Sequence, residues 1–286
     1  MTAYLNGQFL PLDEARISPL DRGFLFADGA YEVVPVYQRR PFLVEAHLQR
    51  LQRTLDGIGL PNPHTFAVWR ELLQRVLADS AFDDQALYLQ VTRGADSKRE
   101  HAFPSAVAPT VFICSHALVS PSAAQRELGV AALSVADSRW LHCDLKTVAL
   151  LANVLLRQQA VAVGCAEAIM LRDGLLTEGA SSNVFLVSDG VLLTPPADQR
   201  ILAGISRQLV LELADRNGVP CEIRDVSEAE MRSADELWLT SSTREVLPVS
   251  TLDGQAVGSG VPGPLGRQMA AWYRAYREQA TRRVDV

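Results

Sequence analysis

Lysine is almost absent from this sequence. Of its 27 lysine and arginine residues, two are lysines, Lys98 and Lys146, and the other 25 are arginines. Arginine does not form a Schiff base with a carbonyl group, because its guanidinium stays protonated. Any chemistry that needs a lysine amine must therefore use one of these two positions.

Several features of exported, membrane-bound and nucleic-acid-binding proteins are also missing. The N-terminal stretch MTAYLNGQFL has no charged segment followed by a long apolar one, so no signal peptide is predicted. No apolar run approaches the roughly 20 residues that cross a bilayer. The net charge is −6, and the basic residues are scattered rather than gathered into a stripe. We expect a cytoplasmic protein that binds neither membrane nor nucleic acid.

Metal-ligand patterns are missing as well. The cysteines have no CxxC spacing, and we interpret all four as reduced, mostly buried thiols: Cys114, Cys143, Cys165 and Cys221. Apart from His101, the histidines are interpreted as surface or structural residues: His47, His64, His116 and His142. The sequence therefore predicts no metal site.

The 286 residues are 48% hydrophobic and 21% charged, as in an ordinary globular protein of one or two domains. Apolar periodicity predicts helices at about 45–58, 65–79, 147–162, 205–216 and 264–280. Strand patterns are mixed with these helices without regular alternation, which favours an α+β fold with antiparallel sheets. A polar stretch predicts a small N-terminal α/β domain at 1–118, a linker at 119–127 and a larger domain at 128–286.

Lys146 stands just before the very apolar helix expected at 147–162, which we expect to be buried. Burial and the positive end of a helix dipole both favour the uncharged, nucleophilic form of a lysine amine. Lys98 stands in the charged loop 96–100 and is expected to be solvated. The residues alone leave two alternatives for Lys146, a Schiff-base lysine and a surface lysine.

Two segments have the residue types that bind a phosphate. Gly204, Ile205 and Ser206 open a helix, where backbone N–H groups form an anion site. The run TSST at 240–243 places four hydroxyls at the end of a strand. Each segment could also be an ordinary helix cap or polar turn. Neither is a Walker or GxGxxG pattern, so an ordinary nucleotide-binding fold is not indicated.

The run EGASSNVF at 178–185, followed by LLT at 192–194 and LAGISR at 202–207, resembles the signature of the class IV (fold type IV) aminotransferases. The segment DRGFLFADGAYE at 21–32 resembles the N-terminal motif of that family, and the resemblance covers nearly the whole chain. It implies a two-domain fold type IV enzyme with pyridoxal 5′-phosphate at the domain interface.

The same resemblance implies roles for individual residues. Lys146 would bind the cofactor covalently, and Glu178 would keep its pyridine nitrogen protonated so that the ring acts as an electron sink. Five residues would bind the cofactor phosphate: Arg50, Gly204, Ile205, Ser206 and Ser242. Arg50 projects away from the apolar stripe of its own helix, so periodicity alone predicts that it faces solvent.

Within the family, VTRG at 91–94 followed by REHAFP at 99–104 resembles D-amino acid aminotransferase. In that branch Arg99 and His101, together with Tyr31, would bind the substrate α-carboxylate, and Val33 would line the substrate site. An arginine fork can bind a carboxylate bidentately. The partner subunit would supply this loop, which implies a homodimer. Pro35 stands where that branch often has a basic residue, and this departure affects the side-chain pocket.

The expected activity is transfer of the amino group of a D-amino acid, of the D-alanine or D-glutamate type, to a 2-oxo acid such as 2-oxoglutarate or pyruvate. The family leaves three alternatives: a branched-chain L-amino acid aminotransferase, an R-selective amine transaminase and an aminodeoxychorismate lyase. A cofactor-free Schiff-base aldolase and a non-catalytic binding protein are alternatives of other classes. The preferred side chain, the strictness of D-stereospecificity, the metabolic role and the oligomer beyond a dimer do not follow from the sequence.

Overall fold

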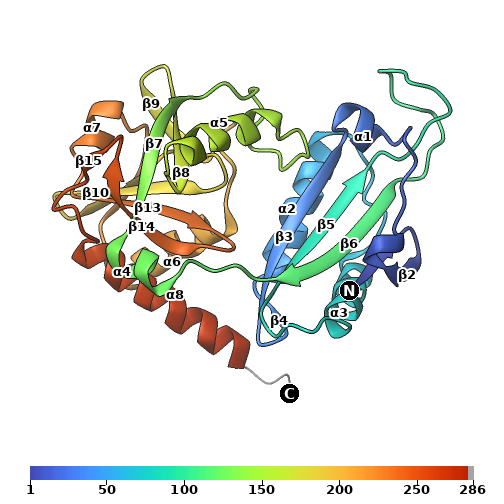
Figure 1. Cartoon of the computed structure of the whole chain (residues 1–286), viewed down its shortest axis with the longest axis horizontal. Coiled ribbons are helices and arrows are strands. Elements are labelled where there is room, and N and C mark those ends of the chain that lie inside the picture. The colour runs from blue at the N-terminus through green and yellow to red at the C-terminus, as the bar shows by residue number, and fades with distance from the viewer. Residues whose placement is uncertain (283–286) are drawn as a thin grey trace. The chain divides into compact units, whose positions relative to one another are not determined.

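A computed structural model describes residues 1–282 of the chain (Figure 1). The chain forms two compact units, described separately below. The first unit comprises Met1–Leu118 and Leu145–Leu150, and the second comprises Val119–Asp144 and the residues from Leu151 onward. Lys146 therefore packs with the first unit, although its place in the sequence lies within the predicted domain 128–286. The separate domains 1–118 and 128–286 stay a prediction.

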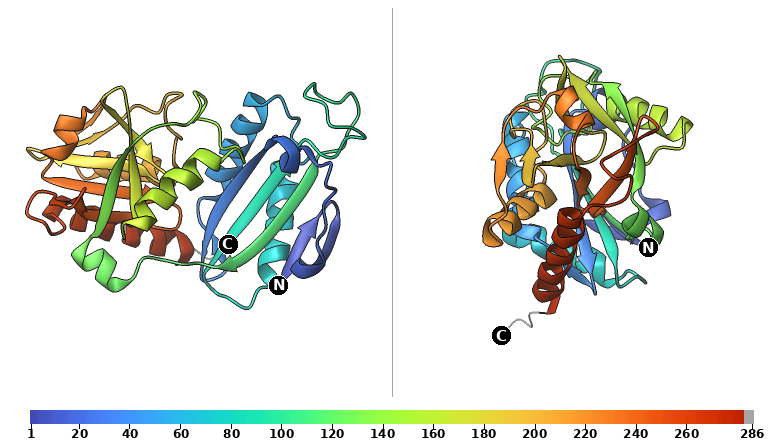
Figure 2. Two further views of the ribbon diagram at one scale, coloured as in Figure 1. Left: turned by 45° about the horizontal axis from the view of Figure 1, so that its top comes forward. Right: turned by 90° about the vertical axis from the view of Figure 1, so that its left-hand side faces the viewer.

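The first unit contains a six-stranded sheet in the order β2-β1-β6-β5-β3-β4. All its pairs are antiparallel, and the three long strands run side by side (Figure 2). Asn6 and Gly7 connect β1 and β2 in a tight turn, and both have positive φ angles, which asparagine and glycine adopt most readily. The strands are β1 (Thr2–Leu5), β2 (Gln8–Pro11), β3 (Gly29–Tyr37), β4 (Arg40–Pro41), β5 (Gln85–Thr92) and β6 (Thr110–Ala117).

Helices α2 (Val44–Gly57) and α3 (Phe66–Ala78) pack on one face of this sheet (Figure 1). Alternate strand residues point toward them, because successive side chains of a strand face opposite sides. The buried cluster includes Val34, Leu48, Leu51, Leu89 and Ile113. A 3₁₀ turn (Leu12–Glu14) and the short helix α1 (Arg22–Phe26) complete the unit.

The second unit contains a nine-stranded sheet in the order β12-β11-β10-β13-β14-β7-β8-β9, with β15 paired to β14. The pairs β11/β12, β14/β7 and β7/β8 are parallel, and the others are antiparallel. The α+β class is confirmed, and this sheet is mixed rather than purely antiparallel. The strands are β7 (Val130–Ala136), β8 (Glu167–Arg172), β9 (Leu175–Gly179), β10 (Asn183–Ser188), β11 (Val191–Thr194), β12 (Cys221–Ile223), β13 (Glu236–Ser241), β14 (Glu245–Leu252) and β15 (Gln255–Ala256).

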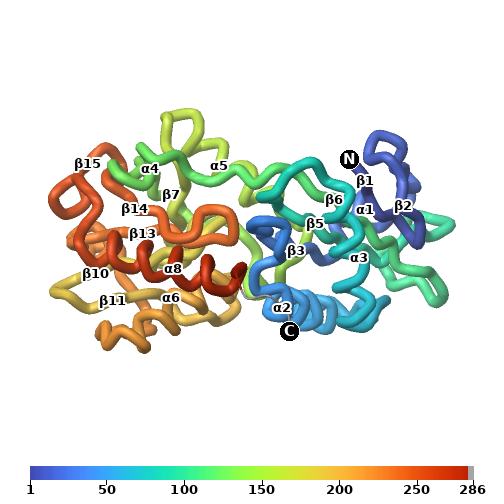
Figure 3. Tube along the Cα trace, turned by 90° about the horizontal axis from the view of Figure 1, so that it is seen from below, coloured from blue at the N-terminus to red at the C-terminus, as the bar shows by residue number. Residues whose placement is uncertain are grey.

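The helices of the second unit are α4 (Ala123–Leu128), α5 (Leu151–Ala162), α6 (Ile205–Arg216), α7 (Glu228–Arg232) and α8 (Pro264–Arg282). Helix α4 lies in the segment expected to be a linker and packs against β14. Helices α6 and α8 lie side by side (Figure 3). The buried Glu236 carboxylate accepts the N–H groups of Leu265 and Gly266 at 3.0 and 2.7 Å, which fixes the start of α8 to β13.

Two expectations about α5 are wrong. The helix begins at Leu151 rather than 147, because residues before it pair with β3 through a bridge between Ala30 and Thr147. The helix is also largely exposed: of its side chains, only Leu156 and Ala160 are buried. A positive helix end next to Lys146 therefore does not exist in this fold.

The cysteines and the membrane prediction can also be compared with the structure. All four cysteines are free, but only Cys143 is buried and Cys221 is exposed, so the prediction of mostly buried thiols is wrong. Among residues 1–282, no helix combines the length and the apolar character needed to span a bilayer.

Candidate active site

Lys146 is held in the first unit by backbone contacts on both sides. Its N–H donates to the Thr54 hydroxyl of α2 at 3.1 Å, and its carbonyl accepts the Tyr31 N–H of β3 at 3.0 Å. Gly57 makes room for this segment, since a Cβ there would lie 2.4 Å from a methyl carbon of Leu145. The Lys146 ammonium lies 4.1 Å from the centre of the Tyr31 ring. The structure therefore brings together two of the predicted site residues, Lys146 and Tyr31.

Tyr31 and Val33 lie on the face of the sheet opposite α2 and α3. They are two residues apart in β3, so their side chains point the same way, and both are partly exposed. Tyr31 stacks on Tyr88 of β5 with ring centres 5.8 Å apart, and Val33 stands opposite Tyr88 in the strand register. This face can therefore line a substrate site beside the lysine.

Glu32 points to the other face and is fully buried beneath α2. Its carboxylate accepts Nε and Nη2 of Arg50, both at 2.8 Å, and lies 2.8 Å from Nδ1 of His47. Burial alone would raise the pKa of Glu32, but the Arg50 charge and both hydrogen-bonding partners hold that pKa well below its usual range. Burial also lowers the pKa of His47. This is a charged, structurally fixed cluster.

The prediction from periodicity that Arg50 faces solvent is wrong. It is 4% exposed, not solvent-facing, because its guanidinium forms the bidentate pair with Glu32. Apolar periodicity predicts which side of a helix packs in the core. It cannot predict that a buried carboxylate on the facing strand will hold an arginine of that helix. His47, interpreted as a surface or structural residue, is a buried structural one.

Arg99 and His101 lie in the loop between β5 and β6, and both side chains are exposed. Lys98 is exposed in the same loop, as expected. The loop is held in the first unit by Arg22, which donates to its backbone carbonyls. The Arg-x-His pair is thus presented on an ordered but solvent-accessible segment.

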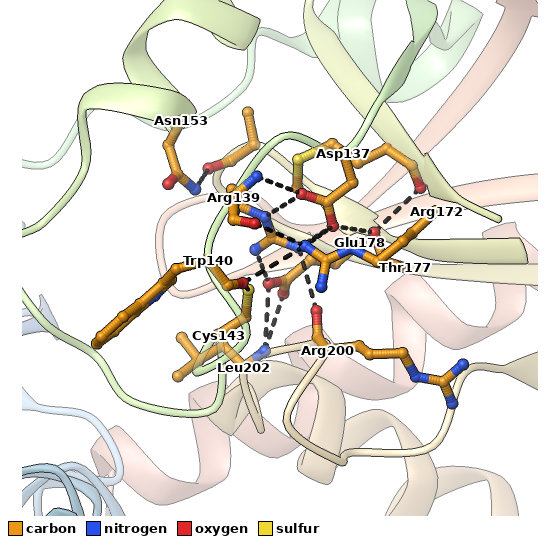
Figure 4. Close-up of polar contacts among 12 residues, drawn as sticks. Asp137, Arg139, Trp140, Cys143, Asn153, Arg172, Thr177, Glu178, Arg200 and Leu202 are labelled. Carbon is orange, nitrogen blue, oxygen red and sulfur yellow. Dashed lines mark hydrogen bonds and ion pairs between the residues drawn. The ribbon is translucent and has the colours of Figure 1, made fainter.

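Glu178 is the second-last residue of β9 in the second unit and is 5% exposed. One carboxylate oxygen accepts Nη1 of Arg139, and the other accepts Nδ2 of Asn183 at 3.1 Å. The backbone N–H of Leu202 lies 3.2 Å from both oxygens. Figure 4 shows Arg139 and Leu202 approaching Glu178 from separate segments. Burial raises the pKa of Glu178 to about 7, against the opposing charge of Arg139.

Arg139 is oriented in turn by Asp137 (Figure 4). Its Nε and Nη2 donate to the two oxygens of Asp137 at 3.0 and 2.8 Å, and Nη2 also donates to the Arg200 carbonyl at 3.1 Å. Asp137 accepts the Thr177 hydroxyl at 3.0 Å and pairs with Arg172 at 3.1 Å. Burial opposes ionisation of Asp137, but its bond to Arg139 lowers the pKa below the ordinary value. Glu178 thus faces a guanidinium that cannot rotate away.

The predicted phosphate-binding segments both adjoin Asn183 in the second unit. A Cβ at Gly204 would lie 2.0 Å from the Asn183 amide oxygen, and Asn183 stands opposite Thr240 in the register of β10 and β13. Gly204 starts α6 without a side-chain cap, and the buried Thr240 hydroxyl has no hydrogen-bond partner. Ser206 bonds to the Tyr273 hydroxyl at 3.0 Å, and Ser242 lies in the turn between β13 and β14. The two segments therefore lie close together. The first backbone N–H groups of α6 and the Thr240 hydroxyl are available to donate hydrogen bonds to an anion.

Sequence reasoning missed several residues of these clusters: Glu32, His47, Thr54, Asp137, Arg139 and Asn183. Apolar periodicity marks none of them, because each acts through a polar side-chain or backbone contact. Glu32 and Asn183 alone carried a signal, because they lie inside the motifs 21–32 and 178–185. Among the residues that the structure describes, no three histidine, cysteine or acidic side chains gather as a metal site would require.

The raised pKa of Glu178 predicts a pH effect in protein purified without cofactor. In the folded protein the Glu178 carboxyl stays protonated up to about pH 7, whereas in the unfolded chain it loses its proton near its ordinary pKa of 4.5. The contribution of Glu178 to the free energy of unfolding therefore falls as pH rises through this window. Glu178→Gln removes the titration, so the stability of the variant relative to wild type should improve by on the order of 3 kcal/mol between pH 4.5 and 8.

Urea denaturation across this pH range measures the effect. Glu127→Gln, at an exposed position of α4, controls for a change of glutamate outside the cluster. Parallel pH curves for wild type and Glu178→Gln would contradict the raised pKa.

Known proteins are similar to this chain over most of its length. The amino-transferase class IV family profile matches residues 29–252. A D-alanine aminotransferase from Bacillus licheniformis is 38% identical over 269 residues, which cover 94% of each chain. One from Staphylococcus epidermidis is 36% identical over 274 residues, with 96% of each chain covered.

Solved structures show the same fold. The branched-chain amino acid aminotransferase of Escherichia coli superposes with a TM-score of 0.89 at 23% identity, covering 96% of this chain and 94% of that one. A hypothetical aminotransferase from Mycobacterium tuberculosis, in its PLP-bound form, gives 0.84 at 27% identity over 98% and 99% of the two chains. The chain belongs to the class IV aminotransferase family and has its fold type IV architecture.

Proposed function

We propose that this protein transfers the amino group of a D-amino acid, of the D-alanine or D-glutamate type, to a 2-oxo acid such as 2-oxoglutarate or pyruvate. The observation that carries this proposal is the exposed loop with Arg99 and His101, a pair suited to a substrate carboxylate. The D-alanine aminotransferases at 38% and 36% identity support it. The branched-chain enzyme, at 23% identity, is similar in fold.

The cofactor is pyridoxal 5′-phosphate, and it supplies an electron sink for the substrate α-carbon when bound. The residues present fit it. Lys146 is one of only two lysines, and Glu178 is a buried acid suited to a pyridine nitrogen. The unpartnered Thr240 hydroxyl and the uncapped start of α6 suit a phosphate.

Individual roles follow from these features. Lys146 would hold the cofactor covalently, and Glu178 would keep its ring nitrogen protonated. Arg50, Gly204, Ile205, Ser206 and Ser242 would bind its phosphate. Arg50 would do so from a fixed orientation, because Glu32 already holds its Nε and Nη2.

The proton transfers are assigned to Lys146. Its Nζ would take the proton from the substrate α-carbon and deliver it to the cofactor, and in the second half of the reaction it would carry a proton back to the α-carbon of the accepting oxo acid. Tyr31 limits where this amine can lie, since the ring centre is 4.1 Å from Nζ. Tyr31, Arg99 and His101 would bind the substrate α-carboxylate and Val33 would line the side-chain pocket, so that the α-hydrogen points toward the lysine. Asp137 and Arg139 would keep Glu178 in place.

We also propose a homodimer in which the partner subunit supplies the loop with Arg99 and His101. The support is the apolar surface of α5, where Leu151, Val154 and Leu155 are 72, 58 and 56% exposed. Contiguous apolar surface of this kind usually marks an interface. Val161 of the same helix and Val163 just after it are also exposed. The cytoplasmic location expected from the sequence stays a prediction.

The enantiomer profile tests the function. With 2-oxoglutarate as acceptor, we expect kcat/KM for D-alanine to exceed that for L-alanine and for L-leucine by roughly 100-fold or more, because the α-hydrogen of only one enantiomer can face Lys146. Keto-acid production from each donor measures this ratio.

The alternatives within the family give different results. Activity on L-leucine alone would indicate a branched-chain enzyme and overturn the proposal. Turnover of (R)-1-phenylethylamine but not D-alanine would indicate an amine transaminase. Pyruvate release from aminodeoxychorismate without an acceptor would indicate a lyase. The cofactor-free aldolase lies outside the family, since its members use the cofactor.

Lys146→Ala should lower transaminase turnover by at least roughly 10³-fold, because the covalent attachment and the proton carrier are both removed. The purified variant should also lose the yellow colour of the bound cofactor. Borohydride reduction followed by peptide mapping should find the adduct on Lys146 in wild type.

Lys98→Ala is the matched control, because it removes the other lysine and should leave the adduct unchanged. An adduct on Lys98, or full turnover by Lys146→Ala, would refute the assignment.

The dimer is tested by sedimentation equilibrium at micromolar concentration. Wild type should sediment as a dimer, and Leu155→Glu should shift it toward monomer, since a charge in an apolar interface is poorly solvated. Val119→Glu, at an apolar position 82% exposed outside α5, is the control. A monomeric wild-type protein would rule out the proposed assembly.

A further inference from the structure

Two arginines and a histidine share one aromatic ring in the first unit. The ring centre of Phe26, the last residue of α1, lies 4.9 Å from the guanidinium carbon of Arg22 and 4.9 Å from that of Arg99. The ring of His101 lies 5.1 Å from it, tilted by 42°. A cation within about 6 Å of a ring face is attracted to its negative potential. Both members of the Arg-x-His pair therefore pack against the same side chain.

Arg22 fixes the backbone that carries this pair. Its guanidinium donates to three consecutive carbonyls, those of Glu100, His101 and Ala102, the last two at 3.1 and 3.3 Å. Arg22 is 3% exposed although the loop itself is exposed. Figure 1 shows the β5–β6 loop beside α1. One buried cation thus restrains three successive peptide groups at the loop tip.

Arg22 is itself held by Asp28. Its Nε donates to Asp28 Oδ2 at 2.8 Å, and the same carboxylate accepts Nε and Nη2 of Arg93 at 2.8 and 3.0 Å. Arg93 also lies 3.6 Å from the ring centre of Phe103, farther along the loop. The loop is therefore attached to buried charges on both sides of His101.

Helix α1 is fixed to the ends of two strands. The Asp21 carboxylate caps α1 by accepting the Gly23 N–H at 2.8 Å, and it also accepts the hydroxyls of Thr92 and Thr110 at 3.0 and 2.6 Å. A Cβ at Gly23 would lie 2.2 Å from a methyl carbon of Thr92, so the helix lies directly against β5. The sheet therefore fixes the position of α1, and α1 in turn fixes the position of the loop.

We propose that Phe26 and Arg22 are positioning residues for recognition of the substrate carboxylate: Phe26 orients the side chains of Arg99 and His101, and Arg22 fixes the backbone between them. This inference rests on the proposed function, in which Arg99 and His101 bind that carboxylate. An exposed arginine has many rotamers, and restricting them before the substrate arrives lowers the entropic cost of binding. Neither positioning residue needs to touch the substrate.

The test compares a substrate that has the carboxylate with one that lacks it. Phe26→Leu keeps apolar volume and removes the ring, so KM for D-alanine should rise by roughly tenfold with a smaller change in kcat. Single-turnover reaction with D-alaninol, which has no carboxylate, should change little. Phe26→Tyr keeps the ring and should restore the wild-type KM. Phe24→Leu, the same change at a 71% exposed position of α1, is the control.

Arg22→Lys provides a second readout that does not depend on catalysis. It keeps the number of trypsin sites but loses the planar fork that reaches three carbonyls. We expect cleavage after Lys98 and Arg99 to become roughly tenfold faster, since a released loop fits a protease more readily. Unchanged cleavage would overturn the role of Arg22.

The outcomes separate this inference from the proposed function. Wild-type enzyme without activity on D-alanine would overturn both. Wild-type activity with an unchanged KM in Phe26→Leu, or an equal loss for D-alanine and D-alaninol, would overturn the role of Phe26 and leave the function intact.

Discussion

A carboxylate that leaves water needs cations or several N–H donors around it, and both units of this chain are organised around carboxylates of this kind. Glu32 holds Arg50 and His47 beneath α2, and Glu178 gathers Arg139 and Asn183 at the end of β9. Removing one partner from such a buried pair costs on the order of 3–5 kcal/mol. The side chains cannot turn away, so charge pairing fixes the strands that carry the candidate site.

Arginine suits this task better than lysine. Its planar fork binds a carboxylate through two parallel bonds and remains charged at any pH at which the protein folds. The composition matches this preference, since the chain has 25 arginines and two lysines. Lys146 stands apart from the pairs: the contacts that hold it are made by its own backbone N–H and carbonyl, and its amine faces the Tyr31 ring. An amine held in this way is available for covalent chemistry.

Local patterns in the sequence predicted much of the fold. Apolar periodicity predicted α2, α3, α6 and α8 within a few residues. These signals arise from neighbours along the chain, which is why one sequence carries them. The motif at 178–207 likewise identified Glu178 and the start of α6, because both lie inside one continuous stretch.

The rest depended on contacts between distant segments. Arg139 meets Glu178 across 39 positions, and Arg50 meets Glu32 across 18, so no periodicity links them. Helix α5 was expected to begin at 147, yet Thr147 forms a bridge with Ala30 of β3 and the helix begins at Leu151. Its exposed face was expected to be buried, since an apolar face that contacts the proposed partner subunit would have the same sequence pattern as one that packs in the core of its own chain.

The scarcity of lysine also matters for how the protein can be handled. Besides the amino terminus, Lys98 and Lys146 are the only amines, and Lys98 is the exposed one. Reagents that couple proteins to resins or dyes through amines would therefore attach at the amino terminus or beside Arg99. A support joined beside Arg99 would crowd the loop proposed to bind the substrate carboxylate. Linkage through the exposed thiol of Cys221, in the other unit, would leave that loop open.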